Sequence, residues 1–125
     1  VDNEAQLDAV TALSGSGPAY VFLFIEALIA GGINLGLSQA QAQQLALATL
    51  KGASLLAADS EDSPARLREN VTSPGGTTAA ALNRFAQGDF AGLVQAAMQA
   101  ANDRAAQMAQ ESAAAGQPPQ DSGKK

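Results

Sequence analysis

The stretch Pro18-Ala19-Tyr20-Val21-Phe22-Leu23-Phe24-Ile25-Glu26-Ala27-Leu28-Ile29 decides the fold of this chain. It predicts a helix over about residues 18–35, because Pro18 suits a first helical position and Gly36 suits a C-terminal cap. This helix is apolar nearly all the way round, and such a helix must be covered on every side. A chain of 125 residues can hardly supply that cover alone, so we expect a second copy of the chain to pack against it.

The rest of the chain also favours helices, because β-branched alternation never lasts long enough to indicate a strand. The fold class is predicted as all-α, a bundle of about five to six helices that forms an interlaced homodimer. Ser38 with Gln41 makes a capping-box pair, and Asp89 is expected to cap the last helix. Two glycines within residues 14–17 are expected to end the first helix. The remaining helices are expected at residues 3–13, 39–58, 64–71, 77–86 and 90–110.

Composition excludes several classes of function. Seven Lys and Arg against twelve Asp and Glu make the chain acidic, which argues against a nucleic-acid partner. The chain has no cysteine and no histidine, so a thiolate metal site and a conventional catalytic triad are excluded, and no metal is expected. The longest apolar run, within residues 20–30, falls short of the roughly 18 to 20 residues of a membrane span, so we expect a soluble, cytoplasmic protein without a membrane partner.

The domain organisation is predicted to be simple. Residues 1–111 are expected to form one helical domain, and residues 112–125, rich in Gly, Gln and Pro, are expected to form a flexible polar tail. The chain begins with Val1 and no charged segment precedes an apolar one, so it is expected to be a domain cut from a longer protein.

The segment most able to carry chemistry is Arg68-Glu69-Asn70-Val71-Thr72-Ser73-Pro74-Gly75-Gly76-Thr77-Thr78. Here one helix is expected to end and another to begin, with two glycines between them. The first turn of a helix offers unpaired N–H groups and the positive end of the helix dipole, so a carboxylate or phosphate can bind there without a basic side chain. Gly75 and Gly76 let a ligand approach the backbone, and Ser73, Thr77 and Thr78 add hydroxyl donors.

Spacing by itself leaves alternatives open. Ser73 to Thr78 could be only a turn between two helices, and a glycine-rich loop without a preceding strand is a poor nucleotide fingerprint. Glu26 is expected to be partly exposed or hydrogen-bonded at the dimer seam. Arg66, Arg68 and Arg84 are expected to be surface residues paired with Asp62, Glu69 and Asp89.

Two motifs carry a resemblance to a known family. Asn70 through Thr78 resembles the signature of pyrroline-5-carboxylate reductases, in which an Asn-Val pair, two small residues, Pro-Gly-Gly, a variable residue and Thr follow one another. The segment from Asp8 to Tyr20, DAVTALSGSGPAY, also resembles that family, as do Gly31-Gly32 and Leu35-Gly36-Leu37. The resemblance covers residues 4–110.

The resemblance implies the C-terminal, dimer-forming part of an enzyme that uses NADPH or NADH to reduce 1-pyrroline-5-carboxylate to L-proline. It implies that Ser73, Gly75, Gly76 and Thr77 hold the substrate carboxylate, that Thr78 is the catalytic residue bonded to the ring nitrogen, and that Asn70 and Val71 border the cofactor. The family's N-terminal Rossmann domain is not found in this sequence, so the chain alone is expected to bind no cofactor and to be inactive. The other hypotheses are a non-catalytic helical oligomerisation module and an acidic helical domain that binds a partner helix. Preference between NADH and NADPH and assembly beyond the dimer stay open.

Overall fold

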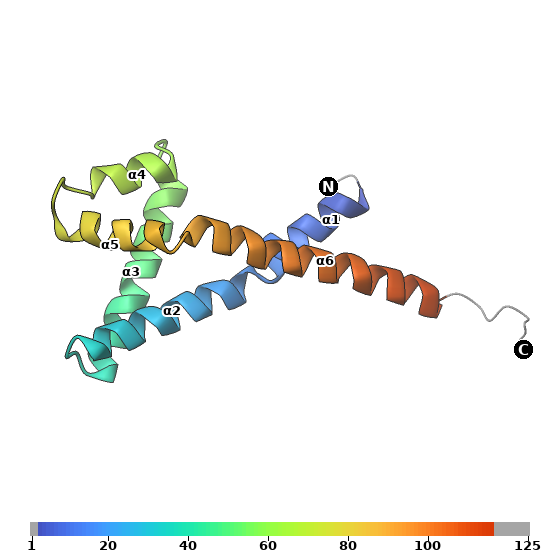
Figure 1. The fold of residues 1–125 in the computed structure, drawn as a ribbon, viewed down its shortest axis with the longest axis horizontal. Helices are drawn as coiled ribbons and strands as arrows, with labels where there is room; N and C mark the ends of the chain where they lie inside the picture. Colours follow the sequence, from blue (N-terminus) through green and yellow to red (C-terminus); the bar gives the residue numbers. More distant parts are fainter. Residues whose placement is uncertain (1–2, 117–125) are drawn as a thin grey trace, which may run out of the picture. The chain divides into compact units, whose positions relative to one another are not determined.

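The computed structural model describes residues 3–116, and this part of the chain contains helices and no strands. The prediction of an all-α fold is therefore confirmed. The helices follow one another along the chain in the order shown in Figure 1. Their bounds are α1 (Glu4–Val10), the π-helical turn η1 (Thr11–Gly15), α2 (Gly17–Asn34), α3 (Gln39–Asp59), α4 (Pro64–Asn70), α5 (Thr77–Gln87) and α6 (Phe90–Gly116).

The chain forms two compact units. Among the described residues, one unit consists of residues 3–18 and 92–116, and the other of residues 19–91. The second unit holds most of α2, all of α3, α4 and α5, and the first residues of α6. The loop that the sequence singles out for chemistry therefore lies entirely within the second unit.

The ends of α2 and α3 follow from local hydrogen bonds that the sequence signals. Gly36 has a φ of 104°, which only glycine adopts freely, and it ends α2 as predicted. The N–H of Leu37 donates to the C=O of Gly32 and the N–H of Gly36 donates to the C=O of Ile33, which is the hydrogen-bond pattern of a Schellman motif. Ser38 then begins α3 with the predicted capping box, in which the Gln41 N–H donates to Ser38 Oγ and the Ser38 N–H donates to Gln41 Oε1.

The boundary between the first two helices falls at Ser16, within the predicted break, but a π-helical turn that the sequence did not predict precedes it. Residues 11–15 form a π-helical turn, in which the Ser16 N–H donates to the Thr11 C=O at 2.8 Å, and α2 resumes at Gly17. Pro18 explains the wider turn, because a proline ring inside an α-helix collides with the carbonyl four residues earlier, here that of Ser14. One extra residue in the turn moves that carbonyl aside, so α2 begins directly after Ser16.

Taken together, α1, η1 and α2 make the apolar helical stretch longer than the sequence analysis predicted. Glu4–Asn34 forms one helical stretch of 31 residues, and its most apolar window of 18 residues has a mean hydropathy of 1.5. By length and composition alone this stretch is long and apolar enough to cross a membrane, and the core helix of a soluble protein meets the same criterion. None of that window is buried within the single chain. A helix covered by a second copy has the same composition, and this is the role predicted for α2.

The last helix also differs from the prediction. It continues to Gly116, six residues beyond the expected end, because Ala113, Ala114 and Ala115 are strong helix formers. The remainder of the expected tail, residues 117–125, lies outside the described residues. Between α5 and α6, Asp89 has a φ of 53°, a left-handed conformation that aspartate tolerates. Its N–H donates to the Ala86 C=O, so its backbone helps to end α5.

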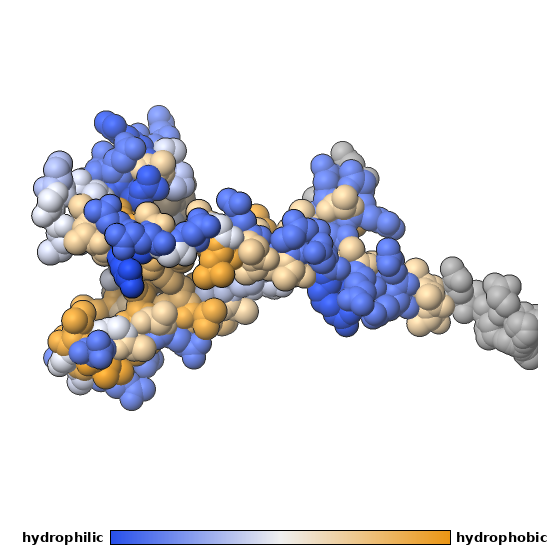
Figure 2. Space-filling model, viewed as in Figure 1, coloured by the Kyte–Doolittle hydropathy of each residue, from blue (hydrophilic) through white to orange (hydrophobic). Residues whose placement is uncertain are grey.

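The buried core of the described chain is small. Only three of its residues are buried, and all three are alanines, namely Ala12, Ala42 and Ala46. Large apolar side chains stay exposed on both units, and on α2 the exposed fractions of Phe22 and Leu23 are 64% and 68%. Figure 2 shows apolar surface over the end of α2 and the start of α3, where Leu35 is 87% exposed. This amount of bare apolar surface is typical of a chain that folds against another copy.

Candidate functional site

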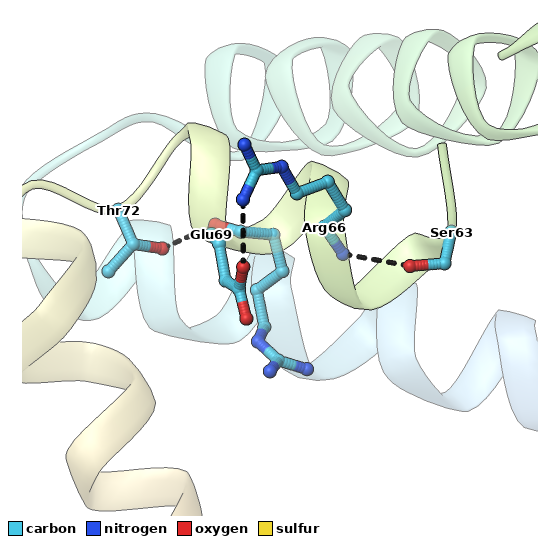
Figure 3. Close-up of polar contacts among 5 residues, drawn as sticks. Ser63, Arg66, Glu69 and Thr72 are labelled. Atoms are coloured by element: carbon cyan, nitrogen blue, oxygen red, sulfur yellow. Dashed lines mark hydrogen bonds and ion pairs between the residues drawn. The ribbon is translucent and has the colours of Figure 1, made fainter. Parts of the chain in front are cut away.

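The candidate site begins at α4, a helix of seven residues that is held at both ends. At its start Ser63 Oγ accepts the Arg66 N–H at 3.1 Å, and Pro64 occupies a first-turn position where its missing N–H costs nothing. At its end the Thr72 hydroxyl donates to the Arg68 C=O at 2.5 Å and the Thr72 N–H donates to the Glu69 C=O at 3.1 Å. Figure 3 shows the bond at Ser63 and the bond from the Thr72 hydroxyl.

A tight turn follows α4. The Gly76 N–H donates to the Ser73 C=O at 3.0 Å, with Pro74 and Gly75 at the two central positions. Gly75 has a φ of 73°, so the turn has the proline and the left-handed glycine of a type II turn. A Cβ added to Gly76 would lie 3.2 Å from the Ser73 oxygen and 3.4 Å from the Ser73 Cβ. Residue 76 must therefore be small, and Ser73 lies beside the start of α5.

Helix α5 begins directly after this turn and no side chain caps it. Gly76 is its N-cap residue, and no side-chain hydrogen bond is made there. The starts of α1, α3 and α4 differ, because Asn3, Ser38 and Ser63 each accept a first-turn N–H. The first intrahelical bond that reaches back to the N-cap of α5 comes from the Ala80 N–H, so the amides of residues 77–79 precede it and face the loop.

The structure brings the predicted carboxylate-binding residues together around this helix start. Ser73, Gly75 and Thr77 are exposed, whereas Gly76 and Thr78 are half-buried. Asn70 is the last residue of α4 and Val71 is its C-cap, so both lie at the other side of the same loop. The first-turn amides of α5 and the exposed hydroxyls of Ser73 and Thr77 are donors of the kind that can bind an anion.

The arginines of α4 and α5 pair differently from the prediction. Arg66 lies 3.7 Å from Glu69, one turn along its own helix, rather than beside Asp62. Arg84 donates to Gln87 at 3.2 Å, also within its own helix. Residues three positions apart are neighbours on a helix, which explains both pairs. As expected, these arginines are exposed, and Glu26 on α2 is exposed too.

A groove of about 680 Å³ lies beside α5, on the second unit. Three aromatic rings form its apolar part: the centroid of Phe90 is 6.3 Å from that of Phe24 and 5.3 Å from that of Phe85. Arg68 and Asn83 contribute polar groups. Most of the lining is apolar, so this groove suits a helix face better than a charged metabolite.

One residue of the loop escaped the sequence analysis. Thr72 contributes two of the hydrogen bonds that end α4, yet it belongs to none of the predicted sets of site residues. Its position, four residues after Arg68 at a helix end, is the signal that could have found it, because Thr hydroxyls often bond to the carbonyl four residues earlier.

Within residues 3–116 no group of three acidic, Cys or His side chains is placed to hold a metal ion.

Comparison with known proteins identifies the family. A family model for pyrroline-5-carboxylate reductase dimerisation matches residues 4–108. The chain belongs to this pyrroline-5-carboxylate reductase dimerisation family. It is 50% identical over 111 residues to the pyrroline-5-carboxylate reductase of Pseudomonas aeruginosa and 44% identical over 108 residues to that of Arabidopsis thaliana, which covers 89% and 86% of this chain. The predicted family is thereby confirmed.

Solved structures of the family share the fold. A pyrroline-5-carboxylate reductase from Coxiella burnetii matches 86% of the chain at a TM-score of 0.83 and 43% identity. The Plasmodium falciparum pyrroline carboxylate reductase, solved with NADP bound, matches 82% at a TM-score of 0.80 and 40% identity. This chain spans about two fifths of the length of these relatives, 41% for the Pseudomonas protein and 39% for the Plasmodium structure.

Proposed function

We propose that this chain is the dimer-forming and substrate-binding part of an NAD(P)H-dependent reductase that converts 1-pyrroline-5-carboxylate to L-proline. The observation that carries the proposal is the uncapped start of α5 behind the Ser73–Gly76 turn, in a member of the pyrroline-5-carboxylate reductase dimerisation family. A substrate carboxylate meets the unpaired amides and the positive end of the helix dipole there.

Each predicted residue has a role in this proposal. Ser73 and the Thr77 amide hold the carboxylate, while Gly75 and Gly76 let it approach the backbone; the Gly76 N–H itself closes the turn by donating to the Ser73 C=O. Thr78, half-buried in the first turn of α5, donates to or accepts from the ring nitrogen. Fixing the carboxylate and the nitrogen together orients the C=N bond, so positioning supplies most of the catalysis and no histidine base is required.

In this proposal the chain borders the cofactor but does not bind it alone. Residues 3–116 contain no strand, so they supply no strand-fed glycine-rich loop for a dinucleotide. Asn70 and Val71 are placed at the edge of the loop, where they border the nicotinamide. When bound, a reduced nicotinamide supplies the hydride. We propose that a Rossmann domain completes the site, and that residues 3–116 alone show no turnover.

The same proposal covers assembly and location. The exposed apolar face of α2 and the match to the dimerisation family favour an interlaced homodimer of residues 1–111. We also propose that the protein acts in the cytoplasm, without nucleic acid or membrane as a partner. The exposed apolar side chains would equally suit a second candidate, a non-catalytic oligomerisation module in which residues 73–78 are only a turn. Ligand binding at the loop separates the two candidates.

The test is a chemical-shift titration of the full-length protein with proline and with cyclopentanecarboxylate. Amides between Asn70 and Ala80 should move with both ligands. Thr78→Val should weaken proline binding and spare cyclopentanecarboxylate, because it removes one hydroxyl and leaves the backbone amides in place. Ser73→Ala should weaken both. In the 125-residue chain alone we expect only millimolar affinity, about 4 kcal/mol, because one wall of the site is lacking.

The two candidates give opposite results in this titration. If saturating proline moves no amide between residues 70 and 80 of the full-length protein, the loop is a turn and the oligomerisation module is the correct reading. If both variants bind as the wild type does, binding occurs elsewhere and the assigned roles of Ser73 and Thr78 are wrong.

A further inference from the structure

Thr72 links the end of α4 to the start of the candidate substrate loop. Its hydroxyl donates to the Arg68 C=O and its N–H donates to the Glu69 C=O. Both carbonyls belong to the last turn of α4, where the N–H of the C-cap residue Val71 also donates to them. Two bonds from one residue to two carbonyls leave little freedom in the direction in which the chain leaves the helix.

That direction determines where Ser73 lies. Ser73 follows Thr72 directly, and its C=O accepts the Gly76 N–H that closes the turn. A continuous series of hydrogen bonds therefore runs from the last turn of α4 through Thr72 and Ser73 to the N-cap of α5. The Thr72 hydroxyl is the only side-chain group in this series for which the described residues show a bond.

Helix α4 gives Thr72 a fixed support. Ser63 caps its first turn, and Arg66 and Glu69 form an ion pair on its exposed face. The ion pair is more than half exposed and contributes little by itself. Figure 3 shows the hydroxyl bonds at the two ends of this short helix, one accepted by Ser63 and one donated by Thr72, which add to the backbone bonds there.

We propose that Thr72 is a positioning residue for the substrate carboxylate. Its hydroxyl holds the Ser73 side chain and the first amides of α5 on the same side of the turn, so that one carboxylate can contact both. Without the hydroxyl the chain keeps the N–H bond to Glu69 but gains freedom at Ser73, and the donors no longer converge before the ligand binds. This inference rests on the function proposed above for the loop.

The experiment is steady-state kinetics of the full-length enzyme with three variants. Thr72→Val removes the hydroxyl and keeps the branched shape, and Thr72→Ser keeps the hydroxyl. Thr49→Val is the matched control, because the Thr49 hydroxyl makes the same kind of bond, to the Leu45 C=O at 2.7 Å, within α3. We expect Thr72→Val to raise the KM for pyrroline-5-carboxylate about three- to tenfold, or about 0.7 to 1.4 kcal/mol, which matches one hydrogen bond.

The other parameters distinguish positioning from a general structural effect. The kcat and the KM for the nicotinamide cofactor should change less than about twofold, because a lost carboxylate contact weakens ground state and transition state alike. Thr72→Ser should restore the substrate KM, and Thr49→Val should leave it unchanged. A Thr72→Val enzyme with a lower kcat, both KM values raised and a lowered Tm would show a structural role and overturn the inference.

Ser73→Ala and Thr78→Val separate this inference from the proposed function. If both raise the substrate KM and Thr72→Val does not, the loop binds substrate and Thr72 does not position it. If neither of them changes the substrate KM, the proposed site is wrong and the role of Thr72 is wrong with it. If Thr72→Val and Ser73→Ala raise the KM together and the double variant adds little more, both act on the same contact.

Discussion

Gly32→Ala tests how tightly α2 packs against α3. A Cβ at Gly32 would lie 3.1 Å from the Cβ of Ala42 and 3.3 Å from Cδ1 of Leu37. Leu37 can rotate its side chain away, but Ala42 is one of the three buried residues and its Cβ moves only if α3 moves. Overpacking of this kind costs about 1 to 3 kcal/mol.

Matched controls isolate that cost from helix propensity. Gly31 and Gly52 lie inside α2 and α3, and a Cβ at either meets nothing within 4 Å in the chain. Replacing glycine by alanine inside a helix gains about 1 kcal/mol, and this gain is shared by all three variants. Gly32→Ala should therefore be less stable than Gly31→Ala or Gly52→Ala by about 1 to 3 kcal/mol, or at least about 4 °C in Tm.

The assay is thermal unfolding followed by circular dichroism at one fixed protein concentration, because assembly of copies raises the apparent Tm. Ala42→Gly completes a double-mutant cycle: with Ala42 removed, Gly32→Ala should become stabilising. The reasoning fails if Gly32→Ala unfolds at the same temperature as both controls, or if Ala42→Gly does not change its effect.

Three further predictions concern the helices that carry the site. Phe24→Asp should abolish helical circular dichroism, because the Phe24 ring lies 6.3 Å from that of Phe90 in the apolar cluster, and a native spectrum would contradict this. Light scattering of the chain at micromolar concentration should give the mass of a dimer, since Phe22 and Leu23 are left more than half exposed in one copy, and a stable helical monomer would refute the interlaced arrangement. Pro18→Ala should shift the amide resonances of residues 11–17, because the π-helical turn can then return to α-helical register; unmoved amides would show that Pro18 does not impose the turn.

Local signals predicted the helix ends well wherever one residue closes a hydrogen bond. The capping box of Ser38 and Gln41 and the left-handed Gly36 are examples, and both ends lie where the sequence indicated. The Ser38 side chain, and the lack of a side chain at Gly36, act on backbone atoms only a few residues away. The spacing of residues in the sequence is therefore enough to predict these helix ends.

The sequence misled where two local signals competed. Gly15 and Gly17 weaken a helix, and Pro18 starts one, which together suggested a break. The structure has a boundary at Ser16, as these signals suggested, but a π-helical turn precedes it that neither signal predicted. The end of α6 was placed too early for a related reason, since polar residues around Ser112 hid the helix preference of the alanines that follow.

The candidate loop and the helical bundle are stabilised by different interactions. Residues 63–78 are held by hydrogen bonds between near neighbours, and those bonds are complete within one copy of the chain. The helices that carry the loop bury only three alanines, so their cover must come from beyond the described chain. The local geometry of the candidate site is therefore determined by residues 63–78 themselves. The stability of the helices that carry this segment depends on assembly with another copy of the chain. A substitution at Thr72 and one at Phe22 should consequently affect different properties, the first the placement of donors and the second the population of folded dimer.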